Sequence, residues 1–154
     1  PDDFHGKFDF VWPPCALEHL GSIKAGQRFI LESMKCLRPG GVAVHTTEYN
    51  MSSNLFTVDS YLKRESAVIF RKRDFRNVAK KLEAQGDRIL LDFTPGDAEQ
   101  DLFVNRLPAV EGPFLRFKAR CDLAGLRHIM KYWPFVQTSY GIVVRKGGGP
   151  CANP

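Results

Sequence analysis

The chain has 154 residues, of which 44% are hydrophobic and 25% are charged, and its formal net charge at neutral pH is +5. This composition is typical of a globular domain with a core, and it excludes disordered and fibrous classes of protein. The sequence contains no apolar run of about eighteen residues and no basic leader followed by an apolar segment, so we expect neither a membrane span nor a secretory signal. We therefore expect a soluble, cytoplasmic protein with no membrane partner.

The first predicted element is a strand over Phe8–Trp12, "FDFVW". A short apolar run of this kind is typical of a strand that is covered on both faces, as in a parallel sheet. Pro13 and Pro14 follow and end the strand, because proline has no backbone N–H to donate. Ser22 can then cap a helix that runs to about Leu37 and stops at "RPGG".

The next predicted strand covers Val42–Thr47, "VAVHTT", and is again a continuous β-rich run. A strand, a helix and a second strand in this order favour a parallel strand pair. Residues 48–61 are polar and indicate a loop at the end of this strand. The short segment "AVIF" that follows is either a brief strand or an extended connection.

Asp74 is predicted to cap a second helix that ends near Gln85, before Gly86. Asp87–Phe93, "DRILLDF", is a third predicted strand, and residues 94–113 are predicted to form a long loop that folds over a site. The pattern of residues 114–133 is ambiguous between strand and helix. Thr138–Lys146 is the final predicted strand, so that residues 1–146 form one domain portion and residues 147–154 a disordered tail.

A basic stretch, Leu62–Lys81, carries much of the excess positive charge. Such a stretch is compatible with nucleic-acid binding. The alternative, which we favour, is a solvated helix face, because the apolar residues of the stretch recur at helical spacing and no aromatic side chains alternate with the basic ones. We therefore do not expect nucleic acid as a partner.

Four cysteines are far apart in the chain, at Cys15, Cys36, Cys121 and Cys151. No C-x-x-C pair and no histidine at metal-ligand spacing accompanies them. We expect reduced thiols, and no metal site.

The order of these elements, with "FDFVWPPCALEHL" and "CLRPGGVAVHTTEYN" as its two best motifs, resembles the C-terminal portion of a class I S-adenosylmethionine-dependent methyltransferase of the broad type 11 kind. "GIVVRK" resembles the last, antiparallel strand of that family, paired with "RILLDF". The resemblance implies an α/β fold with a partial Rossmann-like methyltransferase sheet, in which parallel strands are followed by a C-terminal antiparallel strand pair. It also implies S-adenosyl-L-methionine as the cofactor and methyl transfer to a small-molecule acceptor.

The chain departs from this family pattern in one important respect. The family binds its cofactor first through a glycine-rich turn, and no G-x-G-x-G occurs in these residues. "GGG" near the C-terminus does not follow a strand and open a helix, as such a turn must. We therefore expect the cofactor-binding half to belong to a longer parent protein, and this chain alone to bind cofactor weakly or not at all.

The predicted site lies where the first strand leaves the sheet, because ligands of open α/β sheets lie beyond the carboxyl ends of the strands. The resemblance implies that one wall of the cofactor pocket is formed by Trp12, Pro13, Pro14, Cys15 and Leu17. His19 is the candidate general base, because imidazole titrates near neutral pH. Glu18, Thr47, Glu48 and Asn50 are the candidate acceptor-binding residues.

Each of these residues also has a structural interpretation. His19 can be packed under the helix with its ring bonded to backbone, and Glu18 can favour a helix start through the helix dipole. Loop polarity alone can explain the polar residues from Thr46 to Asn50. His45, in mid-strand, is expected to face the core, while Tyr49, Asp97, Asp101 and Arg106 are weaker candidates for the acceptor pocket.

A second hypothesis is a non-catalytic, methyltransferase-like module for subunit association. It follows from the missing cofactor half, which leaves one side of the Phe8–Trp12 strand unpaired. In that case the partner is a second copy of the chain, in a homo-oligomer formed through the exposed strand edge.

Overall fold

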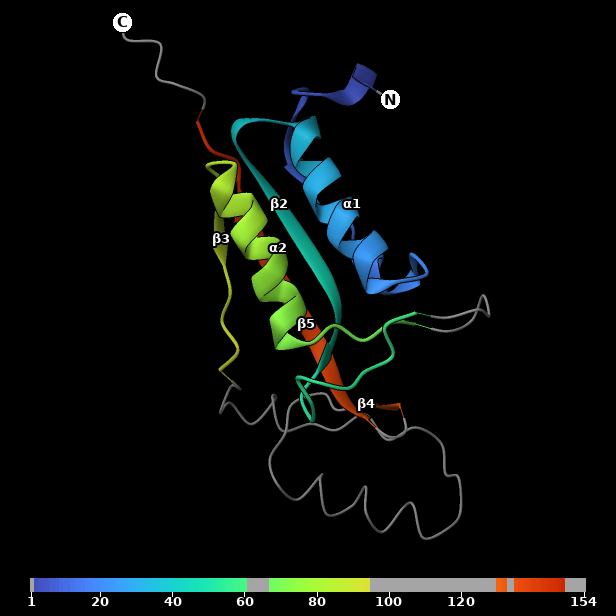
Figure 1. Ribbon diagram of the computed structural model, residues 1–154. Coiled ribbons are helices and arrows are strands. Elements are labelled where there is room, and N and C mark those ends of the chain that lie inside the picture. The colour runs from blue at the N-terminus through green and yellow to red at the C-terminus, as the bar shows by residue number, and fades with distance from the viewer. Residues whose placement is uncertain (1, 61–66, 95–129, 133–134, 149–154) are drawn as a thin grey trace, which may run out of the picture.

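The computed structural model describes residues 2–60, 67–94, 130–132 and 135–148 (Figure 1). Two α-helices, two short 3-10 helices (η) and one mixed sheet account for most of these residues. In chain order the elements are η1 Asp2–Phe4, β1 Phe8–Val11, η2 Leu17–His19, α1 Ile23–Cys36, β2 Leu37–Asn50, α2 Lys72–Ala84, β3 Arg88–Leu90, β4 Met130–Tyr132 and β5 Phe135–Arg145. The coarse prediction of an α/β fold is confirmed.

The sheet has the order β1-β2-β5-β3, and β4 pairs with β5 beside this path. β1 and β2 are parallel, whereas β5 is antiparallel to both β2 and β3. The predicted parallel pair and the predicted antiparallel pairing of the third and final strands are therefore confirmed. β5 lies between β2 and β3 and is antiparallel to each of them.

Helix α1 begins where the sequence predicts, because the Ser22 hydroxyl accepts a hydrogen bond from the Ala25 backbone N–H at 3.1 Å. Helix α2 begins differently. Arg71 is its N-cap residue, and Asp74 lies at the third helical position, where its carboxylate accepts from both the backbone and the guanidinium of Arg71. The prediction that Asp74 is the capping residue is wrong, because its side chain reaches back to the chain that enters the helix. Gly86, with φ +86°, ends this helix region as predicted.

The strand predicted over Val42–Thr47 is longer in the structure, because β2 extends from Leu37 to Asn50. At its start, Gly40 N–H donates to the Lys146 carbonyl and Lys146 N–H donates to the Gly41 carbonyl. At its end, Phe70 N–H donates to the Glu48 carbonyl. These long-range hydrogen bonds hold residues 38–41 and 48–50, which the sequence predicts as turn and loop, in the strand. The predicted strand bounds are therefore wrong at both ends.

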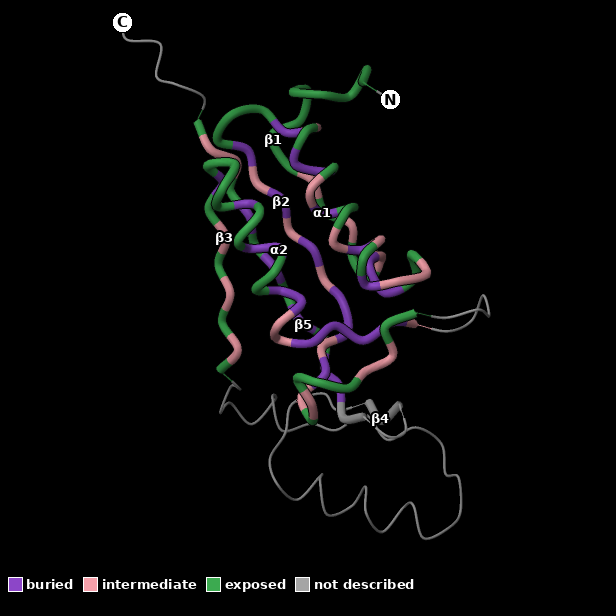
Figure 2. Tube along the Cα trace, in the orientation of Figure 1, coloured by how far each residue is buried: buried purple, intermediate pink, exposed green. Residues whose placement is uncertain are grey.

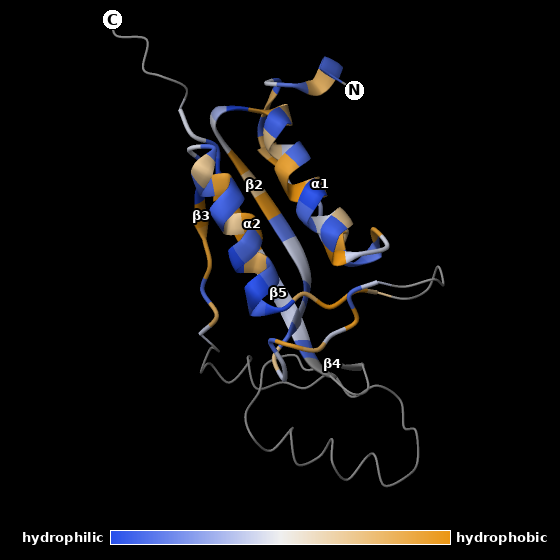
Figure 3. Cartoon of the chain, viewed as in Figure 1, coloured by the Kyte–Doolittle hydropathy of each residue, from blue (hydrophilic) through white to orange (hydrophobic). Residues whose placement is uncertain are grey.

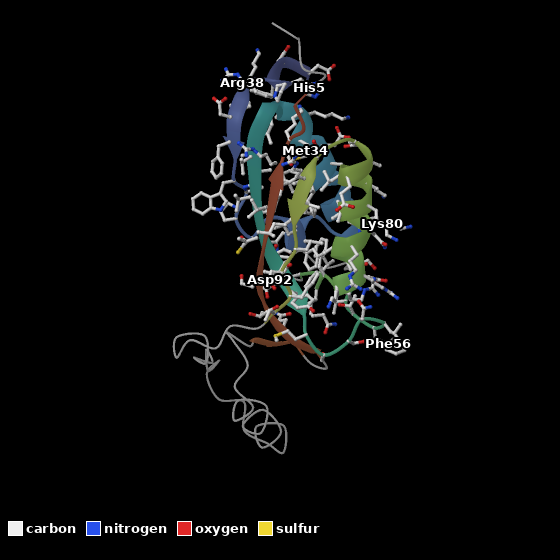
Figure 4. All side chains as sticks on the ribbon, turned by 90° about the vertical axis from the view of Figure 1, so that its left-hand side faces the viewer. His5, Met34, Arg38, Phe56, Lys80 and Asp92 are labelled. Carbon is white, nitrogen blue, oxygen red and sulfur yellow. The ribbon has the colours of Figure 1, made fainter. Side chains whose placement is uncertain are left out.

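Both helices pack on one face of the sheet, as the edge-on view shows (Figures 1 and 4). Met34 of α1 lies between helix and sheet, and Lys80 of α2 points away from the sheet (Figure 4). Helix α2 buries Phe75, Val78 and Leu82, which confirms that much of the basic stretch is the solvated face of an amphipathic helix. The core fills this layer with Leu17, Ile23, Ile30, Met34, Leu37, Ala43, Val68, Phe70, Phe75, Val78, Leu82, Tyr140, Ile142 and Val144.

On the opposite face of the sheet, the part formed by β1, β3 and the adjoining residues of β2 and β5 is largely apolar and open to solvent, whereas Glu48 and Gln137 on this face are buried. The register places Phe10 beside Val42, and Val44 beside Val143, which also pairs with Leu90. Phe10 is 53% exposed and Leu90 is 68% exposed. The hydropathy view shows apolar colour along β3 and the first half of β2, and the burial view shows β1 and much of β3 exposed (Figures 2 and 3). The prediction that β1 is covered on both faces is therefore wrong, because the helices cover one face only.

Several predicted segments are shorter or lie elsewhere. "AVIF" is an extended connection whose last three residues are buried, and β3 covers only part of the predicted third strand. The predicted long loop from residue 95 onward lies outside the described residues, as does most of the ambiguous segment. Gly147, at the start of the predicted tail, donates its N–H to the Asp87 carboxylate, while residues 149–154 are outside the described part. Neither described helix is long and apolar enough to cross a membrane.

Candidate functional site

The carboxyl ends of β1 and β2 lie together, because the two strands are parallel neighbours. After Val11, the two prolines follow the end of β1, and Cys15 reaches the side of β2. The Cys15 backbone N–H donates to the Thr46 hydroxyl at 2.9 Å, and its sulfur lies 3.7 Å from the same oxygen. The loop from β1 is thus tied to the neighbouring strand by one threonine side chain.

Cys15 has a backbone φ of 47°, in the left-handed region that residues other than glycine seldom adopt. Such a conformation costs on the order of 1 kcal/mol and persists only when surrounding contacts fix it. Here the bond to Thr46 supplies one such contact. The loop therefore has a defined conformation at the edge where ligands of α/β sheets lie.

The residues predicted to form the cofactor wall separate into two groups. Trp12 is 61% exposed, Pro14 and Cys15 are exposed, and Pro13 is half-buried. These four lie at the surface where β1 ends. Leu17, in contrast, is fully buried and belongs to the hydrophobic core, so its side chain does not face the same surface.

Two of the candidate acceptor-binding residues, Glu18 and Glu48, are both buried, and Glu18 is close enough to affect the pKa of Glu48. Glu18 is 2% exposed and Glu48 is 8% exposed. The extended segment 68–70 joins their backbones, because Val68 N–H donates to the Glu18 carbonyl and Phe70 N–H donates to the Glu48 carbonyl. Burial raises the pKa of the Glu48 carboxyl, and the neighbouring Glu18 raises it further.

His19, the predicted base, is exposed at the end of η2 and lies on the Glu48 side of the site. Its charge lowers the pKa of Glu48, opposing the effects of burial and of Glu18. Its backbone N–H donates to the Ala16 carbonyl at 3.2 Å. The structure thus brings together His19, Glu18 and Glu48, which the sequence analysis had assigned to two different roles.

Thr47 and Asn50 occupy structural positions. Thr47 is fully buried and alternates with Glu48 along β2, so it faces the helix side. The Asn50 amide oxygen accepts from Ser52 and Ser53, and its nitrogen donates to the Phe56 carbonyl. Asn50 therefore shapes the loop that follows β2.

Gln137 is a site residue that sequence reasoning missed. Its side chain is 3% exposed. In the pairing of β2 with β5, Gln137 lies opposite Asn50, and Ser139, two residues further along β5, lies opposite Glu48. Gln137 and Glu48 therefore share one face of the sheet as diagonal neighbours. Only the pairing of β2 with β5 reveals this, because the two residues are remote in sequence.

The other candidates lie away from this edge. Tyr49 packs against Phe75, Phe93 and Tyr140 on the helix side. Burial raises the pKa of Tyr140 to about 12, so its hydroxyl stays protonated at neutral pH. A surface hollow of about 530 Å³ lies between α2 and the segment after β3, and none of the described residues that line it is a predicted site residue. Asp97, Asp101 and Arg106 lie outside the described residues.

His45 is fully buried and faces α1, as predicted, with its Nε2 3.3 Å from the Ser33 hydroxyl. Cys15 and Cys36 are free thiols, and the other two cysteines are outside the described part. In the ranges that the structure describes, no group of three or more His, Cys, Asp or Glu side chains is arranged to hold a metal ion.

No protein-family model matches this chain, and no curated protein matches its sequence.

Proposed function

We propose that this chain forms the acceptor-side portion of an S-adenosylmethionine-dependent methyltransferase that acts on a small molecule. The observation that carries the proposal is the arrangement of the sheet. β1 and β2 are parallel neighbours, and β3 and β5 form an antiparallel pair beyond them. This is the arrangement implied by the two motifs and the final strands that resemble the family.

The surface residues at the end of β1 suit the cofactor side of such a site. Trp12 offers an exposed aromatic face, and the strained Cys15 backbone is held against Thr46. An aromatic face attracts cations, and the bound cofactor would present a methyl group on a cationic sulfonium. The chain itself contributes one wall only, because its sequence contains no glycine-rich turn of the kind that holds the rest of the cofactor.

The acceptor side would be formed by Glu18, His19 and Glu48. Methyl transfer is a displacement, so its rate depends on holding the acceptor in line with the methyl group. A carboxyl pair beside an imidazole can bind an acceptor that donates hydrogen bonds and can accept its proton.

Binding of S-adenosylhomocysteine, followed by NMR, tests the proposal. Titration of the uniformly ¹⁵N-labelled chain to millimolar ligand should shift the Trp12 indole N–H and the backbone amides of Cys15 and Thr46. In the variant Trp12→Ala, the affinity measured from the Cys15 and Thr46 amides should be about tenfold weaker, because one stacking contact is lost. Phe56→Ala, which removes another exposed aromatic, should leave this affinity unchanged. Shifts confined to another part of the chain would contradict the proposal, whereas the weak or absent binding expected of this portion alone would not.

A second candidate function is a non-catalytic module that associates with a second copy of itself. The open apolar face, formed by Phe10, Val42, Val44, Leu90 and Val143, favours it. Exposed apolar surface of this kind is typical of interaction sites. Self-association of the chain through this face would support the second function.

A further inference from the structure

In the described part of the chain, several buried side-chain oxygens near the carboxyl end of β2 lie without hydrogen-bond partners. The Thr47 hydroxyl is one of them and faces the helix side, and three others are one oxygen each of Glu18 and Glu48 and the amide oxygen of Gln137. The three side chains are 2%, 8% and 3% exposed, so solvent does not readily supply the missing donors. A buried oxygen without a donor is costly, and buried polar groups in proteins are nearly always paired.

The position of Gln137 is what distinguishes this group from a simple acidic pair. Ser139 is the ladder partner of Glu48, and Gln137 follows on the same face two residues along β5. Diagonal neighbours of this kind are separated by about 7–8 Å between their backbones, which long side chains can bridge. A neutral amide oxygen therefore lies on the same face as the carboxylate, from a different strand.

Among the described residues, two charged groups act on the Glu48 carboxyl in opposite directions. Glu18 raises the pKa of Glu48, and His19 is the group that lowers it. Two arginines of the described residues belong to other contacts, since Arg71 pairs with Asp74 and Arg38 pairs with Asp9. The oxygens of this group thus combine negative charge with an excess of hydrogen-bond acceptors.

We propose that Glu18, Glu48 and Gln137 form a binding site for a primary ammonium or guanidinium group of a small-molecule ligand. Ammonium and guanidinium groups carry several N–H donors and no acceptor, which complements a set of acceptors alone. Hydrogen bonds from such cations to carboxylates are roughly twice as strong as neutral ones. A divalent metal is disfavoured, because the described residues hold no group of three metal-binding side chains.

As a statement about the methyl acceptor, this inference rests on the proposed function and names the acceptor as an amine or guanidine compound. As a statement about cation binding, it stands without any methyl transfer. The two are separable by experiment, because cation binding and S-adenosylhomocysteine binding are measured independently on the same chain.

The test is an NMR titration of the full chain near neutral pH with n-propylammonium and with ethylguanidinium. Each should shift the signals of Glu18, Glu48 and the Gln137 side-chain amide. n-Propanol has the same length without the charge, and tetramethylammonium has the charge without an N–H. Both should bind at least about tenfold more weakly, because n-propanol lacks the positive charge and tetramethylammonium lacks the N–H donor of a charged hydrogen bond.

Two isosteric variants and a matched control complete the design. Glu48→Gln and Glu18→Gln should each weaken n-propylammonium binding about tenfold or more while the circular dichroism spectrum is retained. Glu83→Gln removes the same charge from an exposed position on α2 and should bind like the wild type. Gln137→Leu removes the amide without changing charge and should weaken guanidinium binding.

Three outcomes would overturn the inference. The first is equal binding of n-propanol and n-propylammonium, and the second is unchanged affinity in Glu48→Gln. The third is displacement of n-propylammonium by millimolar Mg²⁺ or Ca²⁺ with direct broadening or shifts at the same carboxyls, which would identify a metal site instead. Loss of cation binding with retained S-adenosylhomocysteine binding would contradict this inference and leave the proposed function intact.

Discussion

At the scale of single residues, His45 shows how burial fixes a protonation state. The Ser33 hydroxyl donates to the Ile30 carbonyl at 2.7 Å, so its oxygen is available to accept from His45 Nε2 at 3.3 Å. The neutral ring therefore carries its proton on Nε2, and its Nδ1 is buried without a partner. Burial lowers the pKa of this imidazole from 6.5 to about 4, because the charged form cannot be solvated there.

This shift predicts a loss of stability in acid. The unfolded chain binds a proton at His45 below about pH 6.5, whereas the folded chain does so only near pH 4. Stability from this group is therefore complete above pH 6.5 and is lost as the pH falls to 4, by roughly 3 kcal/mol. Urea unfolding of the wild type and of His45→Gln at pH 4, 5, 6 and 7 measures it.

The variant should be less stable at pH 7, and the difference between the two proteins should shrink steadily toward pH 4. His5→Gln, at an exposed histidine, should follow the wild-type curve. The raised pKa of Glu48 acts in the opposite direction, since its stabilising protonated form is lost as pH rises. That contribution is common to both proteins and cancels in the difference. A difference independent of pH would show that His45 titrates normally.

At the scale of elements, the contact between α1 and the extended segment before α2 depends on one glycine. Gly26 is buried in α1, and a Cβ atom added there would lie 2.6 Å from Cζ of Phe70 and 3.2 Å from the Leu17 carbonyl oxygen. Phe70 is itself fully buried and stacks on Phe75 of α2. Because residue 26 has no side chain, α1, η2 and the extended segment before α2 can approach one another closely.

Gly26→Ala is predicted to destabilise the protein despite alanine's better helix propensity. In an exposed helix the change would add about 0.5–1 kcal/mol of stability. Here overpacking against Phe70 should reverse the sign and cost about 1–3 kcal/mol in the free energy of unfolding by urea. Phe70→Leu combined with Gly26→Ala should lose less than the sum of the two single changes. A stabilised Gly26→Ala protein would show that the close approach is absent.

The element scale also separates what local signals predict from what they do not. The Ser22 cap set the start of α1, and the apolar stripe from Phe75 to Leu82 set the buried face of α2, because both depend on neighbours within one or two turns. The extent of β2 depended on Lys146 and Phe70, whose hydrogen bonds come from distant segments. The role of Asp74 in the helix cap depended on its own side chain, which accepts a hydrogen bond from the backbone N–H of Arg71, the residue before the helix.

At the scale of the whole molecule, the two faces of the sheet have different environments. Both helices cover one face, and on the other face Phe10, Leu90 and Val143 are 53%, 68% and 40% exposed. β1 is the edge strand of the described sheet, with β2 on one side only. An apolar face beside a free strand edge favours association with another chain or segment.

Self-association through this face is the corresponding prediction. Sedimentation velocity over a range of concentrations should show reversible oligomers, and Phe10→Lys should weaken their association constant about tenfold or more. Phe4→Lys places the same charge at another exposed phenylalanine, outside the sheet, and should behave like the wild type. A wild-type chain that remains monomeric at high concentration would exclude the open face as a self-association surface.

The sequence by itself determined the order of the two α-helices and of the strands that flank them, because caps, prolines, glycines and apolar spacing act over a few residues. From "FDFVWPPCALEHLGS" it placed a strand end and a polar turn that include Glu18 and His19, and from "VAVHTTEYN" it named Glu48. The tertiary structure decided which side chains meet. The pairing of β5 with β2 places Gln137 near Glu48. Glu18 and Glu48 are both buried and lie close together. Both helices pack on one side of the sheet, so apolar residues on the other side stay exposed. These features depend on contacts between residues that are far apart in the chain, and such contacts cannot be predicted from the local sequence pattern.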